Sequence, residues 1–289
     1  MKRLLITTDL HQHRGKWDKL VRAAAVEHPE FILIAGDILP KDVEFNQQRQ
    51  FFPRLRKTLT AIREETGARV LLYLANDDGH FLEPDVDELA ADGLCVNLNQ
   101  RVHRENGLVF CGMSKVRDYP FGYKHYCVPD GDWVADPVQY CGEGLTLDEN
   151  GNEIAIPDLR RYLLGKRSIQ EHLQDLKTQL VSGEMSRSIW MVHQPPTSLG
   201  MDICGDGRQV GSPALLQFIK ENQPLLGCSG HIHESPHQSG GQWVAQVGGT
   251  TWVQTGQVYD RLHYVTLDVT AEYAVTNVRH SVFGGATTN

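Results

Sequence analysis

Short apolar runs alternate with helical segments over the first 75 residues, and this order limits the possible folds more than any other feature of the chain. The runs RLLITT (3–8), FILIAG (31–36) and RVLLYLA (69–75) have the length and the β-branched content of buried strands. Residues 16–30 and 45–67, which separate them, carry apolar side chains at helical spacing. This succession predicts βαβ units and a parallel sheet.

The same alternation returns, after a lapse, in the second half of the chain. The later strands and helices are expected at residues 108–113, 168–181, 188–192, 212–222 and 224–229. Ser212 and Pro213 suit the N-cap and the first position of the last helix. Residues from about 115 to 165 are rich in Gly, Pro, Asp and Tyr, which predicts an irregular insertion that could cover a site. The period-two tail beyond residue 241 predicts antiparallel strands that complete a second sheet.

The length and composition are those of one large globular domain. The chain has 289 residues, 40% of them hydrophobic, and no Gly/Ser-rich linker, so residues 1–289 are expected to form a single domain. A formal net charge of −8 argues against broad binding to nucleic acids or membrane surfaces. The N-terminal apolar run is broken by Asp9 and is too short for a signal peptide, and no run reaches the roughly 18 residues of a membrane span. We therefore expect a cytoplasmic protein whose six scattered cysteines are free thiols.

Polar side chains of metal-binding type follow five separate apolar runs. In chain order they are Asp9, His11, Asp37, Asn76, Asp77, Asp78, His193, His231 and His233. Because open α/β sheets place ligands at the carboxyl ends of their strands, we expect these side chains at one edge. Each has an ordinary explanation by itself, as a helix cap, a turn residue or an exposed loop residue. Ordinary turns do not account for metal-ligand types at five strand ends together.

The donor types indicate which metal would bind. Imidazole nitrogens with few carboxylates suit Mn, Fe, Zn or Ni better than Ca, with Mn the first choice for loading in vitro. The ligand candidates are Asp9, His11, Asp37, Asn76, His193, His231 and His233, which exceed one tetrahedral site. Two divalent ions about 3.5–4 Å apart, sharing one carboxylate, match the set better. Such a pair lowers the pKa of a shared water and stabilises both sides of a phosphoryl displacement.

Five short motifs resemble, in order and approximate spacing, those of the calcineurin-like metallophosphoesterases. They are DLH (9–11), GD (36–37), AND-D (75–78), VH (192–193) and GHIH (230–233). The resemblance implies a four-layer α/β/β/α sandwich of two mixed sheets with a dinuclear metal centre. It assigns the first metal to Asp9, His11, Asp37 and His233. It assigns the second to Asp37, Asn76, His193 and His231, with Asp37 as the bridge.

Two positions depart from the family pattern. Ala75 replaces the usual glycine, which is a small change. Asp77 stands where the family has a histidine that contacts phosphate and assists the leaving group, and Asp78 matches the acid that holds this histidine. His80, three residues beyond Asp77, is a candidate substitute for the missing imidazole. Asp77, Asp78 and His80 are therefore the catalytic candidates, and the mechanism at this point is open.

The insertion supplies candidates for contact with the substrate. Lys115 and Arg117, with Tyr119 nearby, could bind phosphate together with Asn76, although solvated loop residues would have the same composition. The sequence predicts a dinuclear phosphoesterase that hydrolyses a small phosphorylated substrate by a metal-bridging hydroxide. A phosphodiester, or an ester with a good leaving group, is favoured because an ionised Asp77 is a poor acid and repels a dianion. A catalytically silent scaffold and a metal-dependent nuclease are the alternatives, and the substrate, native metal and oligomeric state are left open.

Overall fold

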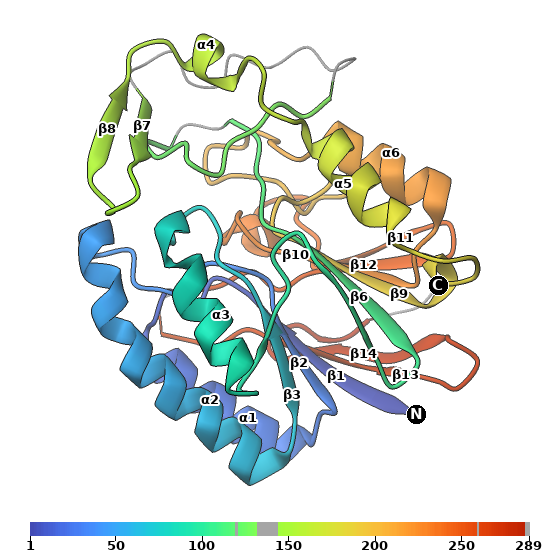
Figure 1. Ribbon diagram of the computed structural model, residues 1–289. Helices are drawn as coiled ribbons and strands as arrows, with labels where there is room; N and C mark the ends of the chain where they lie inside the picture. The colour runs from blue at the N-terminus through green and yellow to red at the C-terminus, as the bar shows by residue number, and fades with distance from the viewer. Residues whose placement is uncertain (119–120, 132–143, 259, 287–289) are drawn as a thin grey trace.

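Two mixed β-sheets pack face to face, and helices cover their outer faces, in a computed structural model that describes residues 1–118, 121–131, 144–258 and 260–286 (Figure 1). This is the predicted α/β/β/α sandwich. The first sheet has the order β15-β14-β13-β1-β2-β3-β4. Its strands are β1 (Lys2–Thr7), β2 (Phe31–Ile34), β3 (Arg69–Leu72), β4 (Val96–Asn97), β13 (Val265–Val269), β14 (Val275–His280) and β15 (Gly284–Gly285). β1, β2 and β3 are parallel, as predicted, and β4, which was not predicted, pairs parallel with β3.

The second sheet has the order β11-β12-β10-β9-β6-β5. Its strands are β5 (Val102–Glu105), β6 (Leu108–Met113), β9 (Ser188–Val192), β10 (Leu226–Ser229), β11 (Val244–Val247) and β12 (Thr250–Gln254). β6, β9, β10 and β12 run parallel, and the two edge strands run antiparallel to their neighbours. The carboxyl ends of the parallel strands therefore lie together at one edge of each sheet.

Successive side chains of each strand point to opposite faces of its sheet, and this builds three apolar layers: one between the two sheets and one between each sheet and its helices. In β1, Leu5 packs with Trp17 and Leu20 of the helix layer, while Leu4 and Ile6 pack between the two sheets. The helices α1 (Arg14–Glu27), α2 (Phe52–Thr66) and α3 (Glu83–Ala91) cover the first sheet. The second sheet is covered by α5 (Ile169–Thr178) and α6 (Pro213–Asn222). Because one core layer joins the two sheets, we infer that residues 1–289 form a single domain.

Most element boundaries agree with the sequence pattern. A 3₁₀ segment, η1 (Phe45–Phe51), precedes α2, and the proline of the first turn of α2 suits that position. Ser212 caps α6 by accepting a hydrogen bond from Leu215 N at 2.9 Å, and a proline follows it as predicted. Helix α3 was not predicted, because its nine residues carry only two buried apolar side chains, Val86 and Leu89.

The tail does not complete one sheet, as the sequence had suggested, but divides between two. β11 and β12 join the second sheet, whereas β13 pairs antiparallel with β1 and brings β14 and β15 to the first. The period-two pattern fixes which side chains face a core but not which strand is the neighbour. This prediction was therefore wrong for residues beyond 264.

The stretch from 115 to 165 is more regular than its composition suggested. Its described part contains a hairpin of β7 (Gly144–Leu147) and β8 (Glu153–Ile156), followed by α4 (Leu159–Leu163). These elements lie beyond the carboxyl ends of β1, β2 and β3 (Figure 1). Within the described ranges, every helix is too short or too polar to cross a bilayer. Cys95, Cys111, Cys127 and Cys228 are buried free thiols, Cys204 is buried, and Cys141 lies outside the described residues.

Candidate metal centre

Loops that follow five strands meet at one edge of the two sheets. Backbone hydrogen bonds join the loops after β1 and β2, since Asp9 N donates to Gly36 O at 3.1 Å and His11 N donates to Asp37 O at 2.9 Å. The loops after β9 and β10 are joined by Gly230 N and His193 O at 3.0 Å. The convergence expected from parallel strand ends is therefore present in the structure.

Asp9, His11, Asp37 and His233 form one compact group. Each offers a ligand atom, and these four atoms lie within 4.8 Å of one another. His233 Nε2 is 3.1 Å from Asp9 Oδ1 and 3.2 Å from His11 Nε2. Asp9 Oδ2 and His11 Nδ1 are buried and have no hydrogen-bond partner among the described residues. A cation at this position would give these buried polar atoms the partner they lack.

The second predicted group surrounds His193, which is fully buried. His193 Nε2 lies 2.9 Å from Asn76 Oδ1 and 3.2 Å from Asp37 Oδ2. Its Nδ1 donates to the carbonyl of Ala35 at 2.7 Å, which leaves the lone pair on Nε2. The ring centroid of His231 is 5.3 Å away, and His231 Nε2 is buried without a partner in the described chain. Three acceptor atoms thus face one another around a position that requires a proton or a metal ion.

The pKa values show how strongly this cluster attracts positive charge. Burial opposes protonation of His193, but the negative charges of Asp37 and Asp9 raise its pKa to about 9. Burial, reinforced by neighbouring histidines, lowers the pKa of His11 and of His231 to about 3. Asp9 likewise raises the pKa of His233 against the effect of burial, so the cluster favours protonation of His193 and His233 and keeps His11 and His231 neutral, the form that binds metals.

Four of the ligand candidates have a left-handed backbone, a feature that the sequence does not reveal. The φ angles are 52° at Asp9, 46° at His11, 52° at Asp37 and 70° at His231. Non-glycine residues in this region each cost on the order of 1–3 kcal/mol, and such strain concentrates at functional sites. The strain marks the loops as shaped for the position of their side chains.

The glycines of two motifs permit the close approach of the loops. Gly36 has φ of 92°, and a Cβ there would lie 2.6 Å from both Ala75 Cβ and His193 Nδ1. A Cβ on Gly230 would lie 2.0 Å from Thr8 Oγ1 and 2.7 Å from Asp9 Oδ2. Any side chain at either position would push a ligand candidate away from the cluster.

Asp78 ties two ligand loops together. Its carboxylate accepts hydrogen bonds from Ile38 N at 3.0 Å, Leu39 N at 2.7 Å and Ala75 N at 3.0 Å. The side chain is fully buried, and both oxygens serve the backbone. This placement favours a positioning role for Asp78, because it holds the loop of Asp37 against the loop of Asn76.

Asp77 lies at the cluster, whereas no contact joins His80 to it among the described residues. Asp77 Oδ1 accepts from Asn76 Nδ2 at 2.9 Å, which turns the amide oxygen of Asn76 toward His193. Burial and the charge of Asp37 raise the pKa of Asp77 to about 6. His80 instead stacks near His125, with ring centroids 5.5 Å apart. Its assignment as the replacement acid stays a prediction.

The predicted substrate residues of the insertion have different surroundings. The Arg117 guanidinium is buried, donates to Gly211 O and lies 3.6 Å from Asp130. That placement favours a structural role at the base of the insertion over contact with phosphate. The Lys115 ammonium lies over the ring of Tyr126, 4.9 Å from its centroid. Tyr119 lies outside the described residues.

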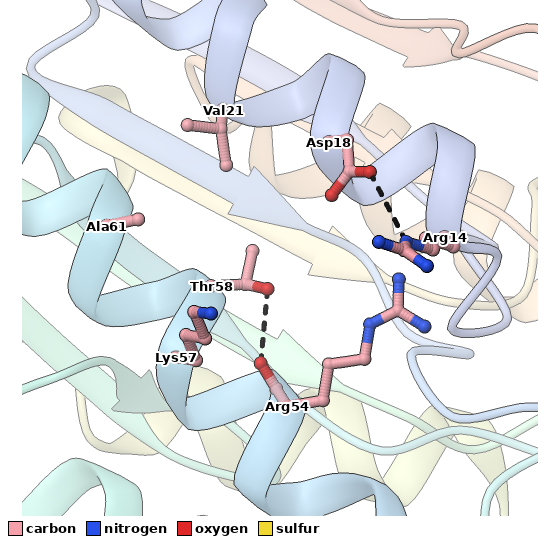
Figure 2. A pocket seen from close by; sticks show the side chains of 7 residues that line it. All are labelled: Arg14, Asp18, Val21, Arg54, Lys57, Thr58 and Ala61. Carbon is pink, nitrogen blue, oxygen red and sulfur yellow. Dashed lines mark hydrogen bonds and ion pairs between the residues drawn. The ribbon is translucent and has the colours of Figure 1, made fainter.

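A separate cavity of about 480 Å³ opens between α1 and α2 on the outer face of the helix layer (Figure 2). It is lined by Arg14, Asp18, Val21, Arg54, Lys57, Thr58 and Ala61. Arg14 pairs with Asp18 at 3.9 Å, one helical turn away. None of the predicted site residues lines this cavity. It is therefore distinct from the seven ligand candidates, called below the strand-end cluster: Asp9, His11, Asp37, Asn76, His193, His231 and His233.

Comparison with known proteins identifies the family. A model of the calcineurin-like phosphoesterases matches residues 2–235, a range that contains all seven ligand candidates. The chain belongs to the calcineurin-like phosphoesterase family. No curated protein sequence matches it significantly.

Solved structures with this fold share little sequence with the chain. The protein TT1561 of Thermus thermophilus is 14% identical with a TM-score of 0.58, over 95% of this chain and 96% of the other. A dimetal phosphatase from Danio rerio is 12% identical with a TM-score of 0.51, over 92% of each chain. At these identities the likeness concerns the fold alone.

Proposed function

We propose that this protein is a dinuclear metal-dependent phosphoesterase. Asp9, His11, Asp37 and His233 would hold one divalent ion. Asp37, Asn76, His193 and His231 would hold the other, with the Asp37 carboxylate shared. The observation that carries the proposal is that His193 Nε2 lies 2.9 Å from Asn76 Oδ1 and 3.2 Å from Asp37 Oδ2, because a nitrogen that accepts so close to two accepting oxygens requires a positive charge beside it.

The donor set fits first-row transition ions. Imidazole nitrogens, two carboxylates and one amide oxygen suit Mn, Fe, Zn or Ni, and Mn is the practical choice for loading. When bound, two such cations lower the pKa of water and neutralise charge on a phosphoryl group. The chain's own contribution is to orient their ligands: the Ala35 carbonyl fixes the tautomer of His193, and Asp77 fixes the amide of Asn76. The nucleophile itself stays a prediction.

We also propose that the substrate is a phosphodiester, or an ester with a good leaving group. Asp77 occupies the position of the usual histidine and cannot donate from an imidazolium. Two bound cations would oppose the raised pKa of its carboxyl group and favour the ionised form. A negative carboxylate beside the site disfavours a dianionic monoester more than a monoanionic diester.

Metal content and turnover together test this proposal. Protein loaded with Mn should bind close to two equivalents and should release 4-nitrophenol from bis(4-nitrophenyl) phosphate, and chelator-treated protein should do neither. Saturation at one equivalent would contradict the dinuclear assignment. Two equivalents without turnover of either aryl monoesters or aryl diesters would instead favour the catalytically silent scaffold.

A further inference from the structure

A group of basic side chains lies beside the loop that carries Asn76. It consists of Lys115, Lys166, His80 and His125, and we call it the basic cluster. The rings of His80 and His125 are 5.5 Å apart between centroids. His125 then packs on Tyr126, whose ring supports the Lys115 ammonium at 4.9 Å. These contacts bring residues of the insertion against the segment that follows Asp78.

Lys166 reaches the same place from the end of the insertion. Its ammonium donates to the carbonyl of Cys127, the residue after Tyr126, at 3.3 Å and lies 3.6 Å from the ring centroid of Tyr162. The electrostatic consequence is mutual repulsion. Burial, followed by the charge of Lys166, lowers the pKa of Lys115. The two ammonium groups are thus held near each other in a partly buried location.

No carboxylate in the described part of the chain lies within 4 Å of the Lys115 or Lys166 ammonium. The acid whose charge reaches Lys115 is Glu83, and its oxygens accept hydrogen bonds from Asn97 at 3.0 Å and Asn99 at 2.6 Å. Partly buried cations without a counter-ion are unfavourable unless an anion binds them. This is the charge arrangement expected of an anion site.

The histidines of the basic cluster also have unused atoms. His125 Nε2 donates to the carbonyl of Asp78 at 2.9 Å, which leaves a lone pair on Nδ1. The Nδ1 atoms of His80 and His125 are both buried and have no partner among the described residues. A phosphate with a hydroxyl group could donate to such a nitrogen while its charged oxygens face the lysines.

The basic cluster is adjacent to the candidate metal centre. Asp78, whose carbonyl His125 contacts, is two residues beyond Asn76, and its carboxylate holds the loop that follows Asp37. The negative charge of Asp37 also reaches His125 and raises its pKa against the larger opposing effect of burial. Asp78 therefore links the basic cluster to the loops that carry Asp37 and Asn76.

We propose that Lys115 and Lys166 form a subsite for a second phosphate group of the substrate, separate from the phosphate that is hydrolysed. This rests on the proposed function, and it narrows the substrate class to phosphoesters that carry a further phosphomonoester. Lys115 binds this phosphate group from the Tyr126 side and Lys166 from the Cys127 side, with His80 and His125 at its edge.

Direct binding tests the subsite without any turnover. Metal-free protein, freed of chelator, is titrated calorimetrically with inorganic pyrophosphate. The Lys115→Gln and Lys166→Gln proteins should each bind about tenfold more weakly or worse, the size expected of a lost charge-assisted hydrogen bond. Arg160→Gln is the matched control, because it removes one exposed positive charge from α4 in the same insertion. Lysine variants that bind as wild type does would overturn the proposal.

A substrate pair tests the use of the subsite. The Mn-loaded enzyme is assayed with 4-nitrophenyl thymidine 5′-phosphate and with its 3′-phosphorylated derivative. In wild type and in Arg160→Gln, the 3′-phosphate should raise kcat/KM about tenfold or more, because it adds a charge-assisted contact with the lysines. In both lysine variants the ratio of kcat/KM with the 3′-phosphate to kcat/KM without it should fall toward one. A ratio that the lysine variants leave unchanged would overturn the assignment to the substrate. Absence of nitrophenol release from both compounds would contradict the proposed function, while the calorimetry still decides the anion site.

Discussion

Two groups of three or more histidines lie within the described part of the chain, and carboxylates surround one of them but not the other. The strand-end cluster combines four histidines with carboxylates and leaves ring nitrogens unpaired among the described residues. The other, which we call the C-terminal histidine cluster, contains His237, His263 and His280, with ring centroids 5.2 and 5.4 Å apart. The described chain offers no carboxylate within 4 Å of any of these three rings.

Hydrogen bonding separates the two clusters further. His280 Nε2 donates to the carbonyl of Thr255 at 2.9 Å, and its Nδ1 accepts from Val282 N and Phe283 N. Both nitrogens of that ring are therefore used by the backbone. In the strand-end cluster, the His193 nitrogen that faces away from the carboxylates is used in this way, and the other faces Asn76 and Asp37. His263 Nε2 in the C-terminal histidine cluster also lacks a partner among the described residues, so it is the neighbouring carboxylates that distinguish the strand-end cluster as a metal site.

The largest expected effect separates the clusters by metal content. Asp37→Asn removes the shared carboxylate, so Mn bound per chain should fall for both ions. Turnover should fall by about a hundredfold or more, since losing even a hydrogen-bond partner of a metal ligand costs roughly 10–100-fold. His263→Gln changes the C-terminal histidine cluster and should leave Mn content within error. Elemental analysis after loading measures both. Equal metal loss in the two variants would mean that the comparison is wrong.

The second prediction concerns the stability of the metal-free protein, in which His193 and the C-terminal histidine cluster should respond to pH in opposite directions. His11 and His231, whose pKa values are lowered to about 3, add to the loss of stability in acid. The pKa of His193 is raised to about 9 from 6.5, so its contribution is present below pH 6.5 and is lost as pH rises through 9. The shift corresponds to roughly 3 kcal/mol. Burial lowers the pKa of His263 and His280 to about 4, so stability is lost as pH falls from 6.5 toward 4.

Thermal unfolding of chelator-treated protein between about pH 4 and pH 10 measures both losses of stability. We call the loss at high pH the alkaline limb and the loss at low pH the acid limb. Saturating Mn should flatten the alkaline limb, because the metal replaces the proton on His193, and should steepen the acid limb, because protonation of the ligand histidines releases the metal. His280→Asn should reduce the acid limb only. An alkaline limb that Mn does not change would remove His193 from the metal centre.

The smallest expected effect lies within the strand-end cluster. Asp77→His should raise turnover of aryl monoesters relative to aryl diesters by up to about tenfold, because it restores a proton donor and removes a negative charge. His80→Ala provides the contrast, since no contact joins His80 to the ligand candidates in the described chain. If His80→Ala slows esters with poor leaving groups much more than esters with good ones, His80 supplies the proton instead. A wild type that prefers alkyl monoesters, together with a harmless His80→Ala, would contradict both explanations.

The convergence of the polar strand ends could be predicted from the sequence because its rule is local. Each follows an apolar run, and parallel strands must end together, so Asp9, Asp37 and His193 could be placed at one edge without knowing any contact. The strand partners of the tail could not be predicted, because β13 pairs with β1 from the opposite end of the chain. The left-handed backbone at the ligands escaped prediction as well, since these are Asp and His residues rather than glycines.

The insertion shows the opposite situation. Its composition predicted a loop-rich region, and Lys115 was one of several polar residues there with no pattern to distinguish it. His125 gave no signal, because it belongs to no motif and becomes notable only when it packs between Tyr126 and His80. Properties that depend on burial, such as an ammonium group without a nearby carboxylate, require the folded chain.

The pairing of β1 with β13 has a consequence for biosynthesis. β1 is translated before every other strand of the two sheets, but one of its edges has no partner until residues 265–269 have been made. One edge of the strand that precedes Asp9 and His11 therefore stays unpaired while the strands between β1 and β13 are synthesised. Exposed strand edges pair readily with other chains. We expect metal loading to be a late step that follows translation of β13, and a ribosome stalled before residue 265 to present an aggregation-prone intermediate rather than a partly active enzyme.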